Sequence, residues 1–249
     1  MSELDGVYVL KHSSIKIVKN VTIYIDPFQI DIPEHDADIV LCTHSHYDHF
    51  SAEDIKKVSN ESTIIVTTED CKNEIYKIGY LEDNIYYCKP YDEFEFEGIK
   101  ISTIPAYNKH KEFHPKSQNW VGYIIEINGT KYYIAGDTDD TKEASSVECD
   151  VAFLPVGGTY TMDYIEAANL ARKIKPEYVI PTHYGTIVGE PEDGIQFKSL
   201  IDEKESKCEK TDFKSDYMDS GHYPYFKLSP SFDQHDRYFL QRKRCGGCE

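Results

Sequence analysis

The residues best suited to chemistry lie in the sequence Thr-His-Ser-His-Tyr-Asp-His, from Thr43 to His49. Three imidazoles and a carboxylate this close together repel one another as cations and lose solvation when they are buried. Such a set is expected to hold a metal ion, because zinc-class ions accept neutral imidazole nitrogen and carboxylate oxygen readily. A solvated histidine-rich loop would seldom show this spacing. The candidate ligands are His44, His46, Asp48 and His49.

The motif is predicted to lie in a loop between a strand and a helix. The apolar run at 39–42 precedes it, and Ser51 follows as a helix N-cap with Asp54 three positions later. A loop of this kind on a rigid scaffold can direct several ligands at one point.

Two further ligand-type residues also follow apolar strands. Asp137 comes directly after the segment 134–136, and His183 comes after 179–182. Taken alone, the first could be a turn aspartate and the second a buried interior histidine. In layered α/β folds, however, the loops at one end of the strands converge and form the site. We therefore expect both residues to join the histidine motif.

The elements that must position these residues follow from the periodicity of apolar side chains. Strands are predicted at 7–10, 14–18, 21–25 and 63–66, with helices near 51–59 and 69–78. A second round comprises strands near 94–104, a hairpin of 120–127 and 132–135, strands at 151–154 and 178–180, and helices at 162–174 and 195–201. Two packed sheets with helices outside them satisfy this order.

Bulk composition narrows the class of protein. A chain of 249 residues with 40% apolar residues can form one large globular domain or two small ones. Its formal net charge of −17 disfavours nonspecific binding to nucleic acid or to an anionic membrane. No apolar run approaches the roughly 18–20 residues of a membrane span, and no secretory signal is recognisable. Seven mostly separated cysteines indicate reduced thiols, so we expect a cytoplasmic protein.

Together these residues resemble the metallo-β-lactamase superfamily, whose signature His-x-His-x-Asp-His is followed by a histidine, a bridging aspartate and a final histidine. The match spans about 7–205. The segment 154–162, together with His12 and 26–28, is similar to the metal-dependent hydrolase branch related to L-ascorbate-6-phosphate lactonase. N-acyl-phosphatidylethanolamine-hydrolysing phospholipase D is a more distant likeness. The resemblance implies an α/β fold, the four-layer αββα sandwich, over residues 1–206.

The resemblance also implies two divalent metal ions, with Zn²⁺ as first choice and Mn²⁺ or Fe²⁺ as alternatives. The first ion would bind His44, His46 and a histidine of the loop 105–119, and the second would bind Asp48, His49 and His183, with Asp137 bridging. The loop offers two histidines. We favour His114, because Pro115 fixes the backbone and Phe113 can bury one side of the ring. His110 lies between two lysines and is expected to be solvated.

The activity implied by the resemblance is hydrolysis. Two ions would share a water and yield hydroxide, which attacks a lactone-like ester or a phosphodiester of a small-molecule substrate. Asp48 would orient this hydroxide while serving as a ligand. Candidate substrate-binding residues are His12, Asn108 and Tyr184.

Two alternatives stay open. An iron-dependent oxygenase of a sulfur compound would also keep a histidine at position 46, although diiron relatives usually have glutamate there. A non-catalytic, metal-stabilised ligand-binding protein is the other alternative. A set of seven ligands disfavours it, since structural zinc sites need only four. Ribonuclease-type relatives share the motif, but the acidic composition disfavours a nucleic-acid partner. Homo-oligomer formation is left open.

Residues 207–249 differ from the rest of the chain. They hold eight basic residues, seven acidic residues and eight aromatic residues without a clear periodicity. We expect a C-terminal extension that packs partly on the domain. Within it, Cys245 and Cys248 form half of a zinc-type site at the very end, where an exposed flexible terminus is the simpler interpretation.

Overall fold

The computed structural model describes residues 3–79, 82–202 and 226–227. The expected C-terminal extension therefore lies outside the described residues apart from one short strand, and the Cys245–Cys248 pair lies outside them entirely.

Six strands form the first sheet, in the same order in space as in the chain. They are β1 (Val7–Lys11), β2 (Ser14–Val18), β3 (Thr22–Ile25), β4 (Ala37–Leu41), β5 (Ser59–Thr68) and β6 (Ile85–Cys88). The first three strands are antiparallel neighbours, whereas β3 to β6 run parallel to one another.

Seven strands form the second sheet, in the order β13-β12-β11-β10-β9-β8-β7. They are β7 (Glu93–Phe96), β8 (Ile99–Pro105), β9 (Val121–Ile127), β10 (Thr130–Ile134), β11 (Val151–Pro155), β12 (Tyr178–Thr182) and β13 (Phe226–Lys227). β10, β11 and β12 are parallel, and β13 adds an antiparallel edge to β12.

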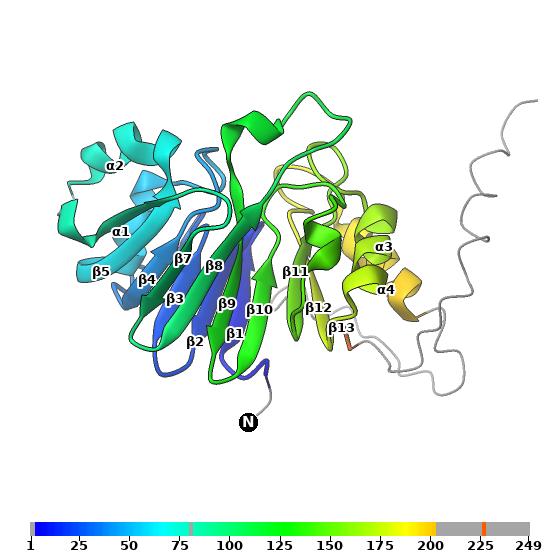
Figure 1. Ribbon diagram of the computed structural model, residues 1–249, viewed down its shortest axis with the longest axis horizontal. Helices are drawn as coiled ribbons and strands as arrows, with labels where there is room; N and C mark the ends of the chain where they lie inside the picture. The colour runs from blue at the N-terminus through cyan, green and yellow to red at the C-terminus, as the bar shows by residue number, and fades with distance from the viewer. Residues whose placement is uncertain (1–2, 80–81, 203–225, 228–249) are drawn as a thin grey trace, which may run out of the picture.

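Helices cover the two outer faces. Figure 1 shows α1 (Ala52–Val58) and α2 (Lys72–Ile78) beside the first sheet, and α3 (Tyr164–Ile174) and α4 (Pro191–Asp202) beside the second. Short 3₁₀ turns, η1 (Glu69–Cys71), η2 (Glu82–Asn84), η3 (Lys116–Gln118) and η4 (Ala144–Ser146), complete the connections. The expected four-layer αββα sandwich is confirmed.

Three apolar layers hold the sandwich together, and alternation along each strand divides its side chains between two of them. In β3, Ile23 and Ile25 face the layer between the sheets, whereas Tyr24 faces α1 and α2. In β11, Phe153 lies between the sheets and Leu154 packs toward α3 and α4. Because both faces of these strands are buried, they have nearly continuous apolar sequences.

The differences from the sequence expectations are local. The helix expected at 162–174 begins at Tyr164, because Asp163 caps it and forms a capping box with Glu166. The helix expected at 195–201 begins earlier, at Pro191, a residue well suited to the first helical turn. Strand β6 was not expected, since its sequence Ile-Tyr-Tyr-Cys is short and follows no clear turn.

The parallel strands bring their carboxyl ends to one edge of the sandwich. The histidine motif follows β4, and Asp137 and His183 follow β10 and β12. Backbone hydrogen bonds join the two sheets here, from Val121 N to Thr43 O (3.2 Å) and from His183 N to His12 O (3.1 Å). None of the described helices is long and apolar enough to span a membrane.

Candidate metal centre

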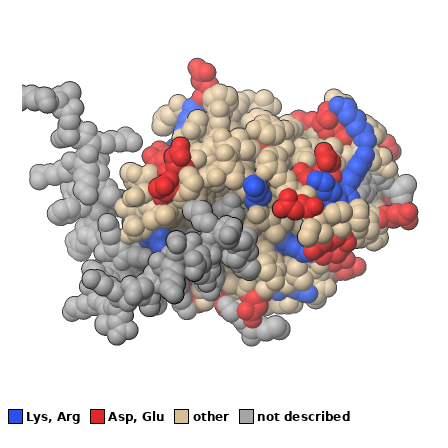
Figure 2. Space-filling model, turned by 180° about the vertical axis from the view of Figure 1, so that it is seen from behind, with Lys and Arg blue, Asp and Glu red and all other residues tan. Residues whose placement is uncertain are grey.

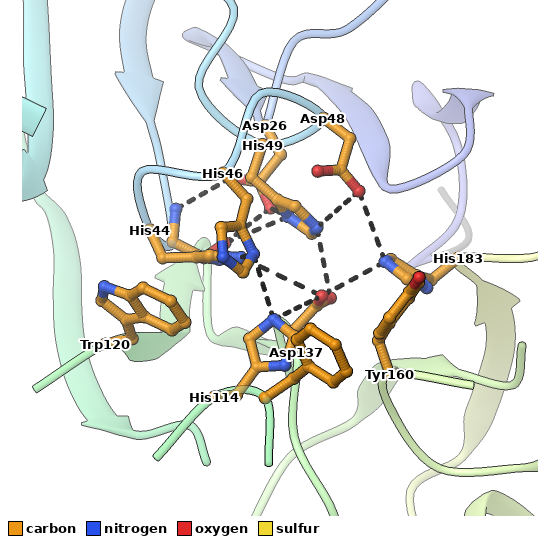
Figure 3. A network of polar contacts seen from close by, with 12 residues as sticks. Asp26, His44, His46, Asp48, His49, His114, Trp120, Asp137, Tyr160 and His183 are labelled. Carbon is orange, nitrogen blue, oxygen red and sulfur yellow. Dashed lines mark hydrogen bonds and ion pairs between the residues drawn. The ribbon is translucent and has the colours of Figure 1, made fainter. Parts of the chain in front are cut away.

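Backbone turns fold the histidine motif into a compact loop. The amides of His49 and Phe50 both donate to the His46 carbonyl, at 2.9 and 2.7 Å. Ser51 then caps α1 by accepting from the Asp54 amide, as the sequence predicted. The histidine and aspartate side chains of this loop point toward residues from the second sheet (Figure 3).

Several residues of the site adopt left-handed backbone conformations. His12, His114 and His183 have φ values of 55°, 58° and 57°, and Asp26 has a φ of 46°. Such conformations cost a non-glycine residue on the order of 1–3 kcal/mol and persist only where the surroundings enforce them. The fold therefore fixes these side chains at the site at some cost in stability.

A first cluster joins His44, His46 and His114 to Asp137. His46 Nδ1 lies 3.0 Å from His44 Nε2 and 3.2 Å from His114 Nε2. His114 Nε2 also lies 3.1 Å from Asp137 Oδ2. One donor atom from each of the four residues falls within 4.8 Å of the others. The structure thus brings His114 into the cluster, while His110 is exposed.

A second cluster lies on the other side of the same aspartate. Asp137 approaches His49 Nε2 through Oδ1 and His183 Nε2 through Oδ2, each at 3.2 Å. Asp48 Oδ2 lies 3.5 Å from both of these imidazole nitrogens and 3.3 Å from His12 Nε2. Asp137 is therefore positioned between the two clusters (Figure 3).

The donor set fits divalent cations. Four nitrogens about 2.0–2.1 Å from a tetrahedral zinc ion lie about 3.3 Å from one another, close to the separations within both clusters. His49 Nε2, His183 Nε2 and Asp137 Oδ1 are buried and make no well-directed hydrogen bond to any described residue. Buried polar atoms are normally satisfied, and a bound cation would satisfy these three.

A third carboxylate, outside both clusters, orients the histidine loop. Asp26, fully buried after β3, accepts from the Thr43 amide and hydroxyl, both at 2.8 Å. Its Oδ2 also lies 2.7 Å from His49 Nδ1. A proton shared there leaves Nε2 of the same ring free to face the centre. The sequence drew attention to Asp26 only through the resemblance, although its place after a strand is the same indication that revealed Asp137.

The three residues expected to bind substrate lie in different surroundings. His12 is buried beside the second cluster, where its Nδ1 lies 2.9 Å from Thr186 Oγ1. Asn108 braces the ligand loop, because its Nδ2 donates to the carbonyls of Phe113 (2.9 Å) and Tyr160 (2.7 Å).

Tyr184 does not join the clusters. Its ring packs in the apolar layer under α4, directly against Gly194, where even an added Cβ would collide with it. We leave it out of the proposed site. Tyr160, which the sequence analysis did not single out as a site residue, is drawn with the site in Figure 3, and its ring contacts the Phe113 ring edge-on with centroids 4.7 Å apart.

The histidines of the two clusters differ in the direction of their pKa shifts when no metal is bound. Burial lowers the pKa of His44 and of His46, with the neighbouring imidazoles acting in the same direction. Burial also opposes protonation of His49 and His183, but Asp137 outweighs it, raising the pKa of His49 well above its usual value and that of His183 to about 9. His44 and His46 are therefore neutral near pH 7, whereas His49 and His183 carry protons.

The aspartates are held ionised. Burial opposes ionisation of Asp48, but contacts with His12 and His183 hold its pKa well below the usual range. For Asp137, attraction to His183 and His49 likewise outweighs burial and lowers the pKa of the carboxyl. The centre thus offers two carboxylates and at least two neutral imidazoles near pH 7, a donor set typical of hydrolytic metal sites.

Comparison with known proteins agrees with this geometry. A family model for the β-lactamase superfamily domain matches residues 6–183. The chain therefore belongs to that superfamily, and its two sheets with flanking helices are the metallo-β-lactamase fold. A UPF0173 metal-dependent hydrolase of Thermococcus onnurineus is 33% identical, over 78% of this chain and 91% of the relative. Within the superfamily, the chain belongs to the UPF0173 metal-dependent hydrolases, and it is an enzyme of that kind.

Solved structures show the same fold. A protein of Parabacteroides distasonis, described as a metal-dependent hydrolase, is 31% identical with a TM-score of 0.66, covering 80% of this chain and 88% of that one. Igni18, a metallo hydrolase of Ignicoccus hospitalis, has a TM-score of 0.65 at 23% identity, covering 90% and 98% of the two chains. The latter likeness concerns the fold alone.

Proposed function

We propose that this enzyme binds two divalent metal ions and hydrolyses a lactone-like ester or a phosphodiester of small size. The observation that carries the proposal is the convergence of seven donor residues from both sheets on one buried centre, with Asp137 between its two halves. Zn²⁺ is the first choice, and Mn²⁺ or Fe²⁺ would suit the same nitrogen and oxygen donors.

The residues divide between two sites. The first ion would be held by His44, His46 and His114, and the second by Asp48, His49 and His183, with Asp137 shared. When bound, the ions would supply an activated water and polarise the scissile carbonyl or phosphoryl group. Asp48 would accept a hydrogen bond from that water and so fix its direction of attack.

The charge of the protein suits a small substrate better than a nucleic-acid polymer. The chain carries a net charge of −17, and the described residues of the face in Figure 2 show acidic and basic side chains in small groups without a continuous basic area. Lysines close to the ligand loop are already neutralised: Lys109 pairs with Asp140, and Lys111 lies 2.5 Å from Asp139. The metal ions themselves would then be the main electrophiles for the substrate.

We also propose that residues 1–206 form the hydrolase domain and that 207–249 are an extension outside the chemistry. Every proposed ligand lies before residue 184, and the family model ends at residue 183.

The test combines metal analysis with a substrate screen. Purified protein should contain close to two transition-metal ions per chain, and it should hydrolyse a generic lactone or a generic phosphodiester. The double variant His44→Ala/His46→Ala should lose one ion in preference to the other and lose activity. One ion in the wild type that is unchanged in the double variant would refute the assignment.

A further inference from the structure

The first cluster is lined by the only tryptophan of the chain. Trp120 lies directly before β9 and is 7% exposed. Its indole contacts all three imidazoles of that cluster, with ring centroids 4.6 Å from His44, 4.7 Å from His46 and 5.3 Å from His114. The ring of His44 lies at an angle of 37° to the indole, and the other two meet it nearly edge-on.

A carboxylate from the first sheet fixes the indole. Asp70 lies in η1, at the end of β5, and its Oδ2 accepts from Trp120 Nε1 at 2.7 Å. The same oxygen accepts from Ser45 Oγ at 2.5 Å. Ser45 stands between two of the proposed ligands. One exposed carboxylate therefore ties the histidine loop to the tryptophan that borders it.

Restricting the rings should matter for metal affinity. An imidazole that rotates freely in the metal-free protein must be ordered when the ion binds, and that loss of conformational entropy weakens binding. The indole removes rotamers from three ligands at once. The second cluster has a different support, since His49 is held by Asp26 rather than by Trp120.

We propose that Asp70 and Trp120 form a positioning pair that sets the metal affinity of the first site without affecting the second. This inference rests on the proposed two-ion function. The pair does not touch the reacting atoms; it acts through His44, His46 and His114.

The test uses the full chain stripped of metal with a chelator and titrated with Co²⁺ alone. Cobalt absorption counts both sites, and a His183→Ala variant, which lacks a proposed ligand of the second site, shows which binding step belongs to the first. In the wild type, two binding steps should be resolved. Asp70→Ala should weaken the first site about 3- to 10-fold, the effect of one lost hydrogen bond, and should leave the affinity of the second site unchanged.

Matched variants separate positioning from general damage. Glu69→Ala removes an exposed carboxylate of the same turn, which pairs with Lys72 at 3.6 Å. This control variant should bind metal like the wild type. Asp70→Asn keeps an acceptor oxygen and should restore most of the affinity. Trp120→Phe keeps an aromatic ring but loses the N–H. The cobalt affinity of its first site should therefore lie between that of the wild type and that of Trp120→Ala.

The outcomes are distinct. Wild-type protein that takes up no ion would refute the proposed function and this inference together. Two ions bound equally well by wild type and Asp70→Ala would refute the positioning pair and leave the proposed function intact. The positioning pair would also be refuted if Asp70→Ala weakened metal binding equally at both sites, or if Glu69→Ala weakened it as much as Asp70→Ala. If Asp70→Ala does not fold, the first-site affinities of Asp70→Asn and Trp120→Phe are compared instead, because both variants keep the packing of the site. Wild-type affinity in Trp120→Phe would then refute the positioning pair.

Discussion

Metal binding to the second site should displace protons, whereas binding to the first should not. In the metal-free protein the pKa of His49 lies well above its usual value and that of His183 is about 9, so both rings are protonated near pH 7. A metal ion needs their neutral nitrogens. The pKa values of His44 and His46 are lowered instead, so these rings are already neutral.

The sign and size of the effect follow from linkage. A ligand whose pKa is raised must release its proton on binding, so affinity grows as pH rises toward that pKa and levels off above it. Release of two protons changes the affinity of the second ion about 100-fold per pH unit, or about 2.7 kcal/mol, between about pH 7 and pH 8.5. The first ion should show a nearly flat dependence.

The assay is competition of Zn²⁺ between the metal-free protein and a chromophoric chelator at several pH values within this window. Calorimetry in two buffers of different protonation enthalpy gives the number of protons released independently. His110→Ala changes an exposed histidine outside both clusters. It should leave the pH dependence of the affinity unchanged for both ions. A second ion whose affinity does not change with pH, or two ions with equal slopes, would refute the assignment of protons to His49 and His183.

Three other outcomes are expected. His114→Ala should cost orders of magnitude in hydrolysis while His110→Ala stays near wild type, and the reverse pattern would move the ligand to His110. Asp26→Ala leaves the buried Thr43 amide without its acceptor, at about 1–3 kcal/mol, so urea unfolding should show a loss of stability that exposed Asp31→Ala does not; equal stabilities would contradict this. Truncation after Glu205 should keep metal content and hydrolysis but lower the melting temperature, because β12 loses its edge partner β13; loss of hydrolysis with metal retained would place the extension in the chemistry.

The sequence alone determined most of the architecture and the larger part of the candidate site. Short, nearly continuous apolar runs indicate strands that are buried on both faces, and such runs predicted β3, β4, β10 and β11. Ligand-type residues placed just after such strands must come together when the strands are parallel. That rule was sufficient for Asp137, His183 and the histidine motif.

Tertiary structure decided what periodicity does not encode. The loop 105–119 has no repeating pattern, so the sequence argued for His114 over His110 only from its neighbours; the inward turn itself depends on a left-handed backbone at His114 and on Asn108 bracing the loop. Tyr184 directly follows His183, a proposed ligand, in sequence, yet the close approach of α4 at Gly194 places its ring in the outer core.

The supporting carboxylates show the same division. Asp26 is 23 positions from the histidine it orients, and Asp70 is 50 positions from the indole that it fixes. Burial and secondary structure are properties of a short stretch of chain and can be inferred from it. A hydrogen bond between distant segments depends on how two sheets pack, and for this protein only the packed structure reveals which carboxylate supports which ligand.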